Sequence, residues 1–168
     1  MPLKMSLSEI ACHDNVIKLA LADEAATEYF AARLSACIQP GMVIYLIGDL
    51  GAGKTTLVRA LLNALGYSGR VKSPTYTLLE HYEIAGLHFR HFDLYRFNSV
   101  DEWEQAGFRD EFDQRNVCLI EWPTKAQGLV PEADMVITFE ILPNNRILEI
   151  RALTQIGRTC LKNFQNLF

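Results

Sequence analysis

Residues 48–56 read Gly48-Asp49-Leu50-Gly51-Ala52-Gly53-Lys54-Thr55-Thr56. This stretch matches the phosphate-binding pattern G-x-x-x-x-G-K-[ST], which fixes four demanding positions at set spacing. An apolar run of strand length, residues 42–47, precedes it, and residues 56–65 read as a helix that ends at Gly66. Strand, glycine-rich loop and helix is the arrangement that this pattern needs. The stretch therefore predicts a phosphate loop within an α/β fold.

The residue types explain how such a loop binds phosphate. Glycines at 48, 51 and 53 permit backbone angles that a side chain forbids, so that backbone N–H groups can converge on an anion. The N-terminus of the following helix adds unpaired N–H groups and a positive dipole end. Lys54 supplies a charge for the outer phosphates, and the Thr55 hydroxyl is placed to ligate Mg²⁺. The residues expected to contact the nucleotide are Asp49, Leu50, Gly51, Ala52, Gly53, Lys54, Thr55 and Thr56. The alternative is an ordinary glycine-rich turn with a surface lysine.

Composition predicts a single globular domain over residues 1–168, since the chain is 49% hydrophobic and shows neither repeats nor low complexity. No apolar stretch reaches the roughly 18 residues of a membrane span, and the first residues do not resemble a signal peptide. We therefore expect a cytoplasmic protein that does not contact membranes. Its cysteines, Cys12, Cys37, Cys118 and Cys160, lack metal-binding spacing and are expected to be reduced.

The net charge of −4 does not indicate a stand-alone nucleic-acid binder, which usually carries a basic surface. A few cations (Arg59, Arg70, Lys72, Arg90 and Arg96) are candidates for a local basic cluster or for neutralising phosphates. Solvated surface charge is the simpler interpretation. The histidines lack the ligand set of a zinc site, although His91 and Asp93 can share one strand face.

Periodicity and turn residues predict the other elements. A helix is expected from Asp23 to about Cys37, with Asp23 as its N-cap and an apolar face of Ala26, Phe30, Leu34 and Ile38. Another begins at Ser99, with Glu102 at capping-box spacing, and ends near Gly107. Strands or hairpin arms are expected at residues 75–84, 87–97, 117–120, 134–142 and 147–153. A last helix is expected over residues 155–168, with Ile156, Cys160, Phe164 and Leu167 on one side. The fold class expected is α/β of the phosphate-loop NTPase type: a parallel core sheet flanked by helices, with antiparallel β-hairpin additions.

Two carboxylates fit the acid that normally completes a nucleotide–Mg²⁺ site at a strand end. Glu121 follows the apolar run 117–120, which suits a buried parallel strand beside the phosphate-loop strand, so Glu121 is favoured as the second metal ligand. Asp93 then orients or deprotonates a water molecule, or binds Mg²⁺ through water. For each residue alone, a surface acid at a strand end is the competing interpretation.

Two further features have open interpretations. The hydroxyls of Ser73 and Thr75 are placed either to sense the outer phosphate, as switch segments do, or to satisfy backbone groups in a plain turn. Trp122 either stacks near the nucleotide or a partner, or packs in the core, which is commoner after a buried strand.

Four blocks, Gly48–Thr56, Val71-Lys-Ser-Pro-Thr-Tyr76, His91-Phe-Asp-Leu-Tyr-Arg96 and Ile120-Glu-Trp122, occur in an order and spacing that closely resemble the bacterial TsaE (YjeE) family. These are small phosphate-loop ATPases of the machinery that makes threonylcarbamoyladenosine in tRNAs reading ANN codons. The resemblance covers roughly residues 20–155. It implies ATP binding through Gly51, Gly53, Lys54 and Thr55, Mg²⁺ ligation by Thr55 and Glu121, and an essential acid at Asp93. It also assigns Thr75 to the switch-like segment and Trp122 to the tryptophan of the Glu-Trp pair.

The resemblance further implies partners, the proteins TsaB and TsaD, with tRNA contacted only indirectly and with ATPase activity that is weak in isolation. The catalytic set it predicts is Lys54, Asp93 and Glu121, with ATP and Mg²⁺ as cofactors. The runner-up is a small-molecule kinase with a phosphate loop. Such kinases usually carry an arginine-bearing lid, whereas a β-hairpin is expected after the loop helix here. A GTP-type switch is weaker still, because no N-K-x-D guanine-reading motif is present.

Overall fold

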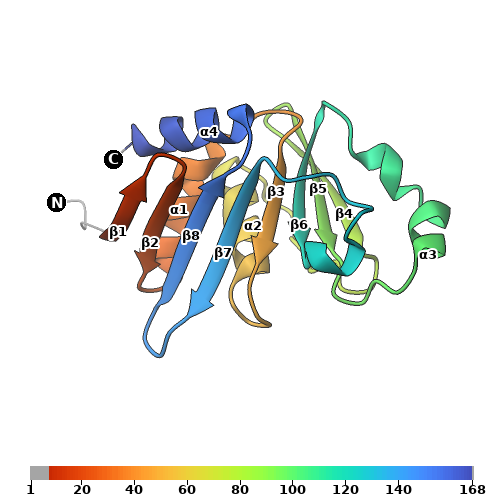
Figure 1. The fold of residues 1–168 in the computed structure, drawn as a ribbon, viewed down its shortest axis with the longest axis horizontal. Helices are drawn as coiled ribbons and strands as arrows, with labels where there is room; N and C mark the ends of the chain where they lie inside the picture. Colours follow the sequence, from red (N-terminus) through yellow and green to blue (C-terminus); the bar gives the residue numbers. More distant parts are fainter. Residues whose placement is uncertain (1–7, 168) are drawn as a thin grey trace.

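The computed structural model describes residues 8–167, in which eight strands form one sheet in the order β1-β2-β8-β7-β3-β6-β5-β4 (Figure 1). The strands are β1 (Ser8–His13), β2 (Val16–Leu21), β3 (Val43–Ile47), β4 (Leu79–Ile84), β5 (Leu87–Asp93), β6 (Asn116–Glu121), β7 (Met135–Ile141) and β8 (Arg146–Ala152). The central strands β7, β3, β6 and β5 run parallel to one another. β4 on one side, and β8, β2 and β1 on the other, are antiparallel additions. The expected α/β class, parallel core and hairpin additions are thereby confirmed.

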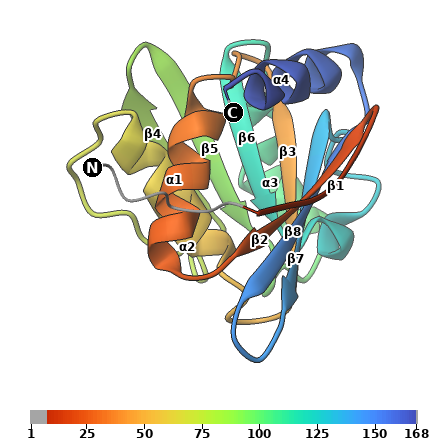
Figure 2. The same cartoon turned by 90° about the vertical axis from the view of Figure 1, so that its left-hand side faces the viewer.

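Three helices cover one face of the sheet: α1 (Glu24–Ser35), α2 (Lys54–Ala64) and α4 (Gln155–Gln165). α1 and α2 lie side by side, as Figure 2 shows, and α4 lies across the top of the sheet in Figure 1. The Asp23 carboxylate accepts a hydrogen bond from the Ala26 N–H at 2.8 Å, which confirms Asp23 as the N-cap of α1. Ala26, Phe30, Leu34 and Ile38 are buried, as the spacing predicted. The core beneath these helices continues into β2, β3, β7 and β8.

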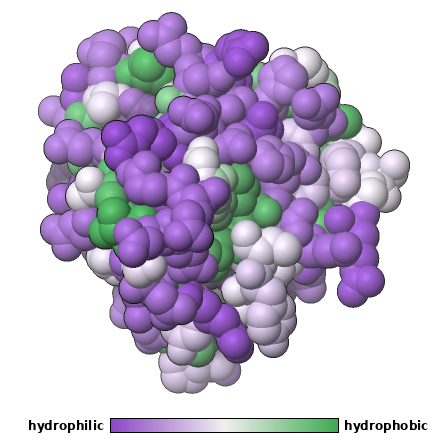
Figure 3. Space-filling view, turned by 90° about the vertical axis from the view of Figure 1, so that its right-hand side faces the viewer, coloured by the Kyte–Doolittle hydropathy of each residue, from purple (hydrophilic) through white to green (hydrophobic). Residues whose placement is uncertain are grey.

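The opposite face of the β3–β6–β5 half is covered by α3 (Val100–Gln105) and the short helices η1 (Phe108–Glu111) and η2 (Pro123–Ala126). A cluster of rings from Phe92, Trp103, Phe108 and Phe112 fills the space beneath them, with ring centroids 5.1–6.2 Å apart. Ser99 caps α3 by accepting from the Glu102 N–H, as predicted. Figure 3 shows the side of the molecule that lies on the right in Figure 1; its surface is mostly hydrophilic, with hydrophobic residues in small groups. No helix within residues 8–167 is long and apolar enough to cross a membrane.

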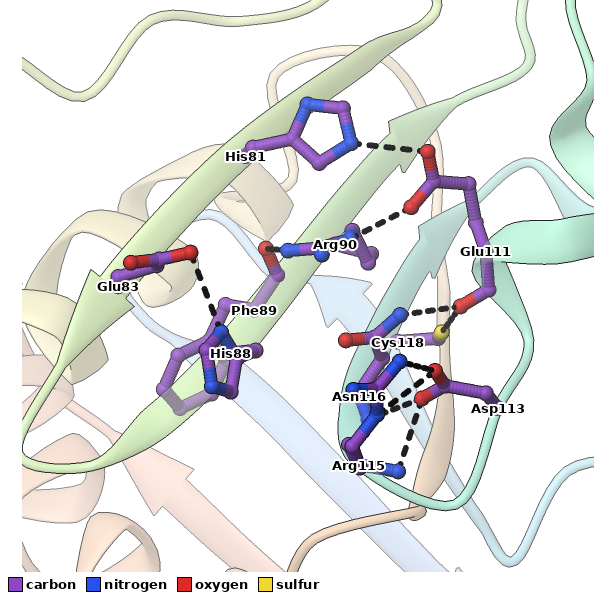
Figure 4. A network of polar contacts seen from close by, with 10 residues as sticks. All are labelled: His81, Glu83, His88, Phe89, Arg90, Glu111, Asp113, Arg115, Asn116 and Cys118. Atoms are coloured by element: carbon purple, nitrogen blue, oxygen red, sulfur yellow. Dashed lines mark hydrogen bonds and ion pairs between the residues drawn. The ribbon is translucent and has the colours of Figure 1, made fainter.

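A polar network fastens η1 to the neighbouring strands (Figure 4). Glu111 accepts a hydrogen bond from Arg90 of β5 at 2.6 Å and contacts His81 of β4 at 3.0 Å. Its backbone carbonyl accepts from the side-chain amide of Asn116 in β6 at 2.8 Å. Burial acts to raise the pKa of Glu111, but hydrogen bonds from His81 and Arg90 outweigh it and lower that pKa. Glu111 thus ties β4 and β5 together through its carboxylate and reaches β6 through its backbone carbonyl.

The hairpin arms predicted over residues 75–84 and 87–97 are too long. β4 begins at Leu79, because residues 74–78 form a turn closed by the Leu78 N–H donating to the Pro74 carbonyl at 2.7 Å. β5 ends at Asp93, where the sheet edge is reached and the chain turns, with the Phe97 N–H donating to the Leu94 carbonyl. α2 also begins earlier than predicted, at Lys54 rather than residue 56. Gly66, with φ +99°, ends it as expected.

Strands β1 and β2 were not predicted from the sequence. In β2, the buried residues Ile17, Leu19 and Leu21 alternate with more exposed ones, as is typical of a strand. The predicted helix over 155–168 exists as α4, but its buried face was misplaced. Ile156 and Leu167 are each 43% exposed, and the face in the core consists of Gly157, Cys160, Leu161 and Phe164. Phe168 lies outside the described residues, as do the side chain of Cys12 and residues 1–7.

Gly157→Ala is expected to destabilise the fold, because a Cβ at this position would stand 2.0 Å from the Asp134 carbonyl oxygen. Forced overpacking of this kind costs about 1–3 kcal/mol. Urea denaturation should show a lower midpoint for Gly157→Ala. Asn163→Ala, an exposed position of the same helix, should remain at or slightly above the stability of the parent chain. Equal midpoints for Gly157→Ala and the parent would contradict the close packing of α4 on the β6–β7 connection.

Candidate nucleotide site

A cavity of about 520 Å³ opens at the carboxyl ends of β3, β5 and β6. Ligands of open α/β sheets bind at this edge. The lining residues are Leu50, Gly51, Ala52, Gly53, Lys54, Thr55, Thr56, Ser73, Thr75, Asp93, Tyr95, Arg96, Glu121, Trp122 and Arg146. All the residues predicted for the site are among them except Asp49. That residue is exposed and contributes its backbone carbonyl to the loop.

The loop backbone is shaped by its glycines, but not in the way expected for all of them. Gly51 and Gly53 have φ values of +77° and +107°, which a side chain rarely tolerates. The expectation was wrong for Gly48, whose φ is not positive. A Cβ at Gly48 would instead stand 3.0 Å from the Cβ of Phe139 and 3.1 Å from that of Ala52. Gly48 is therefore needed for close packing of the loop against β7.

The Lys54 ammonium is held inside the loop. Its Nζ donates to the carbonyls of Gly48 and Asp49 at 2.5 and 2.9 Å, and it lies 4.6 Å from the centroid of the Trp122 ring. The residue is 5% exposed. Burial lowers the pKa of Lys54, against the nearby negative charges of Glu121, Asp93 and Asp49. A cation solvated only by carbonyls and a ring is well placed to exchange those contacts for an anion.

Glu121 ends β6 as a buried carboxylate with two partners. Its Oε1 accepts from the Thr55 hydroxyl at 2.8 Å and from His91 Nε2 at 2.9 Å. The exposed fraction of Glu121 is 3%, and His91 is fully buried. Thr55 and Glu121 thus present two oxygen ligands side by side. Mg²⁺ prefers such oxygens and is usually bound by one or two carboxylates together with substrate phosphates. The donor set fits that ion.

Asp93 ends the adjacent strand and pairs with Glu121 in the parallel register of β5 and β6. One oxygen accepts from the Tyr95 N–H at 3.1 Å, and the other from the Ser73 hydroxyl at 3.4 Å. Burial raises the pKa of Asp93, and the charge of Glu121 adds to that shift, against the two hydrogen bonds. A carboxylate with this environment is suited to accepting a proton or holding a water molecule.

Ser73 and Thr75 flank a turn, as one open interpretation required, and they also line the cavity, as the other required. Pro74 lies at a turn, since its carbonyl accepts from the Leu78 N–H. The hydroxyls of Ser73 and Thr75 also lie 2.8 Å apart on the cavity wall, and Ser73 reaches Asp93. Their hydroxyls are therefore not consumed by the turn itself.

Trp122 likewise contacts both the core and the cavity. It packs against the apolar cluster beneath α3, and it also lines the cavity, with its ring centroid 5.0 Å from that of Tyr95. Its φ is +56°, an uncommon value for a bulky residue, and such strain is often found at functional sites. The turn into η2 thus aims this ring at Lys54.

His91, Arg146 and Tyr95 lie in the cavity region and were not predicted as site residues. His91 was recognised only as sharing a strand face with Asp93, yet it contacts the Glu121 carboxylate, and its Nδ1 is buried without a hydrogen-bond partner among the described residues. Arg146 begins β8, and its Nε lies 3.6 Å from the position a Cβ would take on Gly53. His91 was detectable from the period of two that it shares with Asp93. Nothing local marks Arg146, because β7 and β8 bring it to the loop only in the folded sheet.

Comparison with protein families supports the resemblance. Residues 21–148 match the family described as "Threonylcarbamoyl adenosine biosynthesis protein TsaE". A protein of that name from Haemophilus influenzae is 47% identical over 128 residues, which cover 76% of this chain and 81% of that protein. The Bacillus subtilis protein of the same name is 36% identical over 114 residues, covering 68% and 71%.

A solved structure shares the fold. The crystal structure of YdiB from Bacillus subtilis superposes with a TM-score of 0.75 and 25% sequence identity. The match covers 90% of this chain and 95% of that one. A match of this extent reaches well beyond the phosphate loop that many families share.

His91→Leu is expected to reduce stability by about 1–3 kcal/mol, because it leaves a buried carboxylate with one hydrogen bond fewer. His91→Gln should recover much of this loss, since its amide reaches a position close to that of the imidazole Nε2. Chemical denaturation of the three proteins measures the difference. If Leu and Gln behave alike, the hydrogen bond to Glu121 contributes nothing and the loss comes from packing alone.

Proposed function

The chain belongs to the TsaE family, and on that premise we propose that it is an ATP-binding, Mg²⁺-dependent ATPase subunit that acts in threonylcarbamoyladenosine modification of tRNAs reading ANN codons. The observation that supports this most directly is the convergence of Lys54, Asp93 and Glu121 on one cavity beside a phosphate loop. The family is described as acting in threonylcarbamoyl adenosine biosynthesis, and the cavity supplies the groups that ATP chemistry needs.

In this proposal the loop residues 49–56 bind the phosphates of ATP. Backbone N–H groups at Gly51 and Gly53 and the N-terminus of α2 hold the inner phosphates, as in other phosphate loops. Lys54 releases the Gly48 and Asp49 carbonyls and pairs with the outer phosphates. Trp122 keeps that ammonium beneath a ring face, and Thr75 faces the same space.

Thr55 and Glu121 are the proposed protein ligands of Mg²⁺. When bound, this ion would neutralise charge on the phosphates. His91 positions Glu121 through the 2.9 Å contact, so that the carboxylate is fixed before any ligand arrives. Asp93 orients the attacking water or accepts its proton, and Ser73 links Asp93 to the switch-like segment of residues 73–75.

The proposed partners are TsaB and TsaD, and we propose that hydrolysis resets their complex in the cytoplasm, while the partners themselves hold the tRNA. The composition of the chain is consistent with this division, because its net charge of −4 offers no broad basic surface for RNA. Catalysis of phosphoryl transfer depends on positioning and charge stabilisation, so a site completed by partners should be slow alone.

Purified chain is expected to bind ATP and hydrolyse it slowly, and TsaB with TsaD should raise the rate. Release of inorganic phosphate, measured with and without both partners, tests this.

Lys54→Ala should lose ATP affinity at least about tenfold, since each lost charge-assisted hydrogen bond is worth roughly 1.5–3 kcal/mol. Lys162→Ala, at an exposed position of α4, serves as its control. Phosphorylation of a metabolite by the chain alone at ordinary kinase turnover would instead establish the kinase alternative.

Glu121→Gln is expected to weaken the Mg²⁺ dependence of ATP binding, because the amide keeps the shape of the side chain but removes its charge. ATP titrations at stepwise Mg²⁺ concentrations should show a Mg²⁺ requirement shifted upward at least about tenfold, the usual lower effect of disturbing a metal site. An unchanged requirement in Glu121→Gln would move the metal role to Asp93.

Asp93→Asn is expected to retain ATP binding within a few-fold and to lose hydrolysis by about 10²-fold or more, the typical contribution of a general base. Binding is measured by calorimetry and hydrolysis by single-turnover phosphate release. If binding and hydrolysis fall together, Asp93 has a metal or structural role and is not the group that handles the water.

A further inference from the structure

A second hollow, of about 710 Å³, adjoins the nucleotide cavity and has no role in the function proposed above. Its lining comes from α2 and from the loop of residues 65–78 that leads to β4. The lining residues are Arg59, Asn63, Ser68, Gly69, Arg70, Val71, Lys72 and Ser73. We call this the basic hollow, because Arg59, Arg70 and Lys72 are its charged residues and all three carry positive charge.

The basic hollow has a fixed floor. Val71 and Tyr82 are buried, and the Lys72 N–H donates to the Tyr82 hydroxyl at 3.2 Å. The ring of Tyr82 meets that of Tyr67 edge to face, with centroids 5.2 Å apart. These contacts tie the loop to β4, so the backbone beneath the cations is held in place.

The three cations of the basic hollow are not neutralised by acidic partners, as several other surface cations are. Arg90, Arg109, Arg115, Arg151 and Lys18 each form an ion pair with a carboxylate. Within residues 8–167, Arg59, Arg70 and Lys72 form none, and all three are exposed. Like charges gathered in one concavity raise the local concentration of anions. The hollow is therefore complementary to a ligand that brings negative charge.

Ser73 connects the basic hollow to the nucleotide cavity, because it lines both. Its hydroxyl contacts Asp93 and Thr75, and Lys72 precedes it in the chain. An anion held by Lys72 and Arg70 thus restrains the segment that carries Ser73 and Thr75. Arg59 lies on α2, the helix whose N-terminus faces the cavity. Both walls of the hollow therefore continue into the nucleotide site.

Carboxylates fit this hollow better than an RNA backbone does. A polynucleotide requires a basic groove that follows its phosphates and usually aromatic rings for its bases. Among the residues that the structure describes, no aromatic side chain lines the hollow. The net charge of the chain is −4, whereas a stand-alone RNA binder usually carries a broad basic surface. Arginine forks bind carboxylates in a bidentate manner, and three cations match a short acidic segment.

We propose that the basic hollow binds a carboxylate-rich segment of a partner protein and that this contact restrains the switch-like segment of residues 73–75. The inference rests on the proposed function, since the nucleotide site is what the contact would regulate. Acidic residues of the partner pair with Arg59, Arg70 and Lys72, and the restraint reaches Asp93 through the Ser73 hydroxyl.

The probe is a fluorescein-labelled peptide of eight glutamates, compared with a labelled octauridylate RNA, in anisotropy titrations at low salt and at physiological salt. The double variant Arg59→Glu/Arg70→Glu should lose peptide affinity at least about tenfold, and Lys72→Ala should lose less. The control Arg158→Glu/Lys162→Glu makes the same change in net charge on α4, far along the chain from the hollow, and should stay within about twofold of the parent.

Three results would overturn the proposal: no binding of the peptide, tighter binding of the RNA that the same variant abolishes, or equal losses in the hollow and control variants. Thermal unfolding of each variant establishes that it folds.

Single-turnover ATP hydrolysis should change several-fold when the peptide is added to the parent chain and should not change when it is added to the hollow variant. If the chain binds the peptide but does not hydrolyse ATP, the proposed function is contradicted while the peptide site in the basic hollow is supported. Failure of the proposed function can therefore be distinguished from failure of the proposed binding site.

Discussion

The buried carboxylate of Glu121 is the constraint on which the site and much of the fold depend. Its exposed fraction is 3%, and it accepts hydrogen bonds from α2 through Thr55 and from β5 through His91. Removing a carboxylate from water costs several kcal/mol unless it is paired and hydrogen-bonded. Strands β3, β6 and β5 must therefore keep their register, with Glu121 opposite Leu46 on one side and Asp93 on the other. A slip of one residue would turn the carboxylate away from both partners.

That register explains which parts of the site could be predicted from the sequence. The glycine loop, Asp93 and Glu121 lie at strand ends, and parallel strands bring their carboxyl ends to one edge of a sheet. Local patterns were therefore enough to place them together. The contact of His91 with Glu121 depends on the pairing of β5 with β6, and the approach of Arg146 to Gly53 depends on β7 lying beside β3. Neither pairing is encoded by a short motif.

The errors in element boundaries have related causes. Residues 75–78 and 94–97 contain strand-forming residue types, but the chain has passed the sheet edge there and its backbone bonds go to turns. Leu78 adopts a φ of +63°, a strained value that no propensity predicts for leucine. On α4, the helical period suggested Ile156 as a core residue. Cys160 and Phe164 are buried as predicted, but Gly157, which approaches the Asp134 carbonyl closely, takes the place expected for Ile156. In each case tertiary contacts outweigh local preference.

The distribution of charge around the cavity is consistent with the proposed nucleotide site. Lys54, Arg96 and Arg146 face Asp93 and Glu121 across the lining, so the positive groups available to the phosphates are partly offset by the two acids. Lys54 is additionally held by loop carbonyls, while Leu50 and Tyr76 at the rim are 63% and 83% exposed. Desolvation strengthens electrostatic interactions in such a site, and a rim this open leaves the cavity wet. A protein surface that covered Leu50 and Tyr76 would exclude water from the cavity. The loop of residues 65–78 contributes to the linings of both the cavity and the basic hollow, so the same surface would contact both sites.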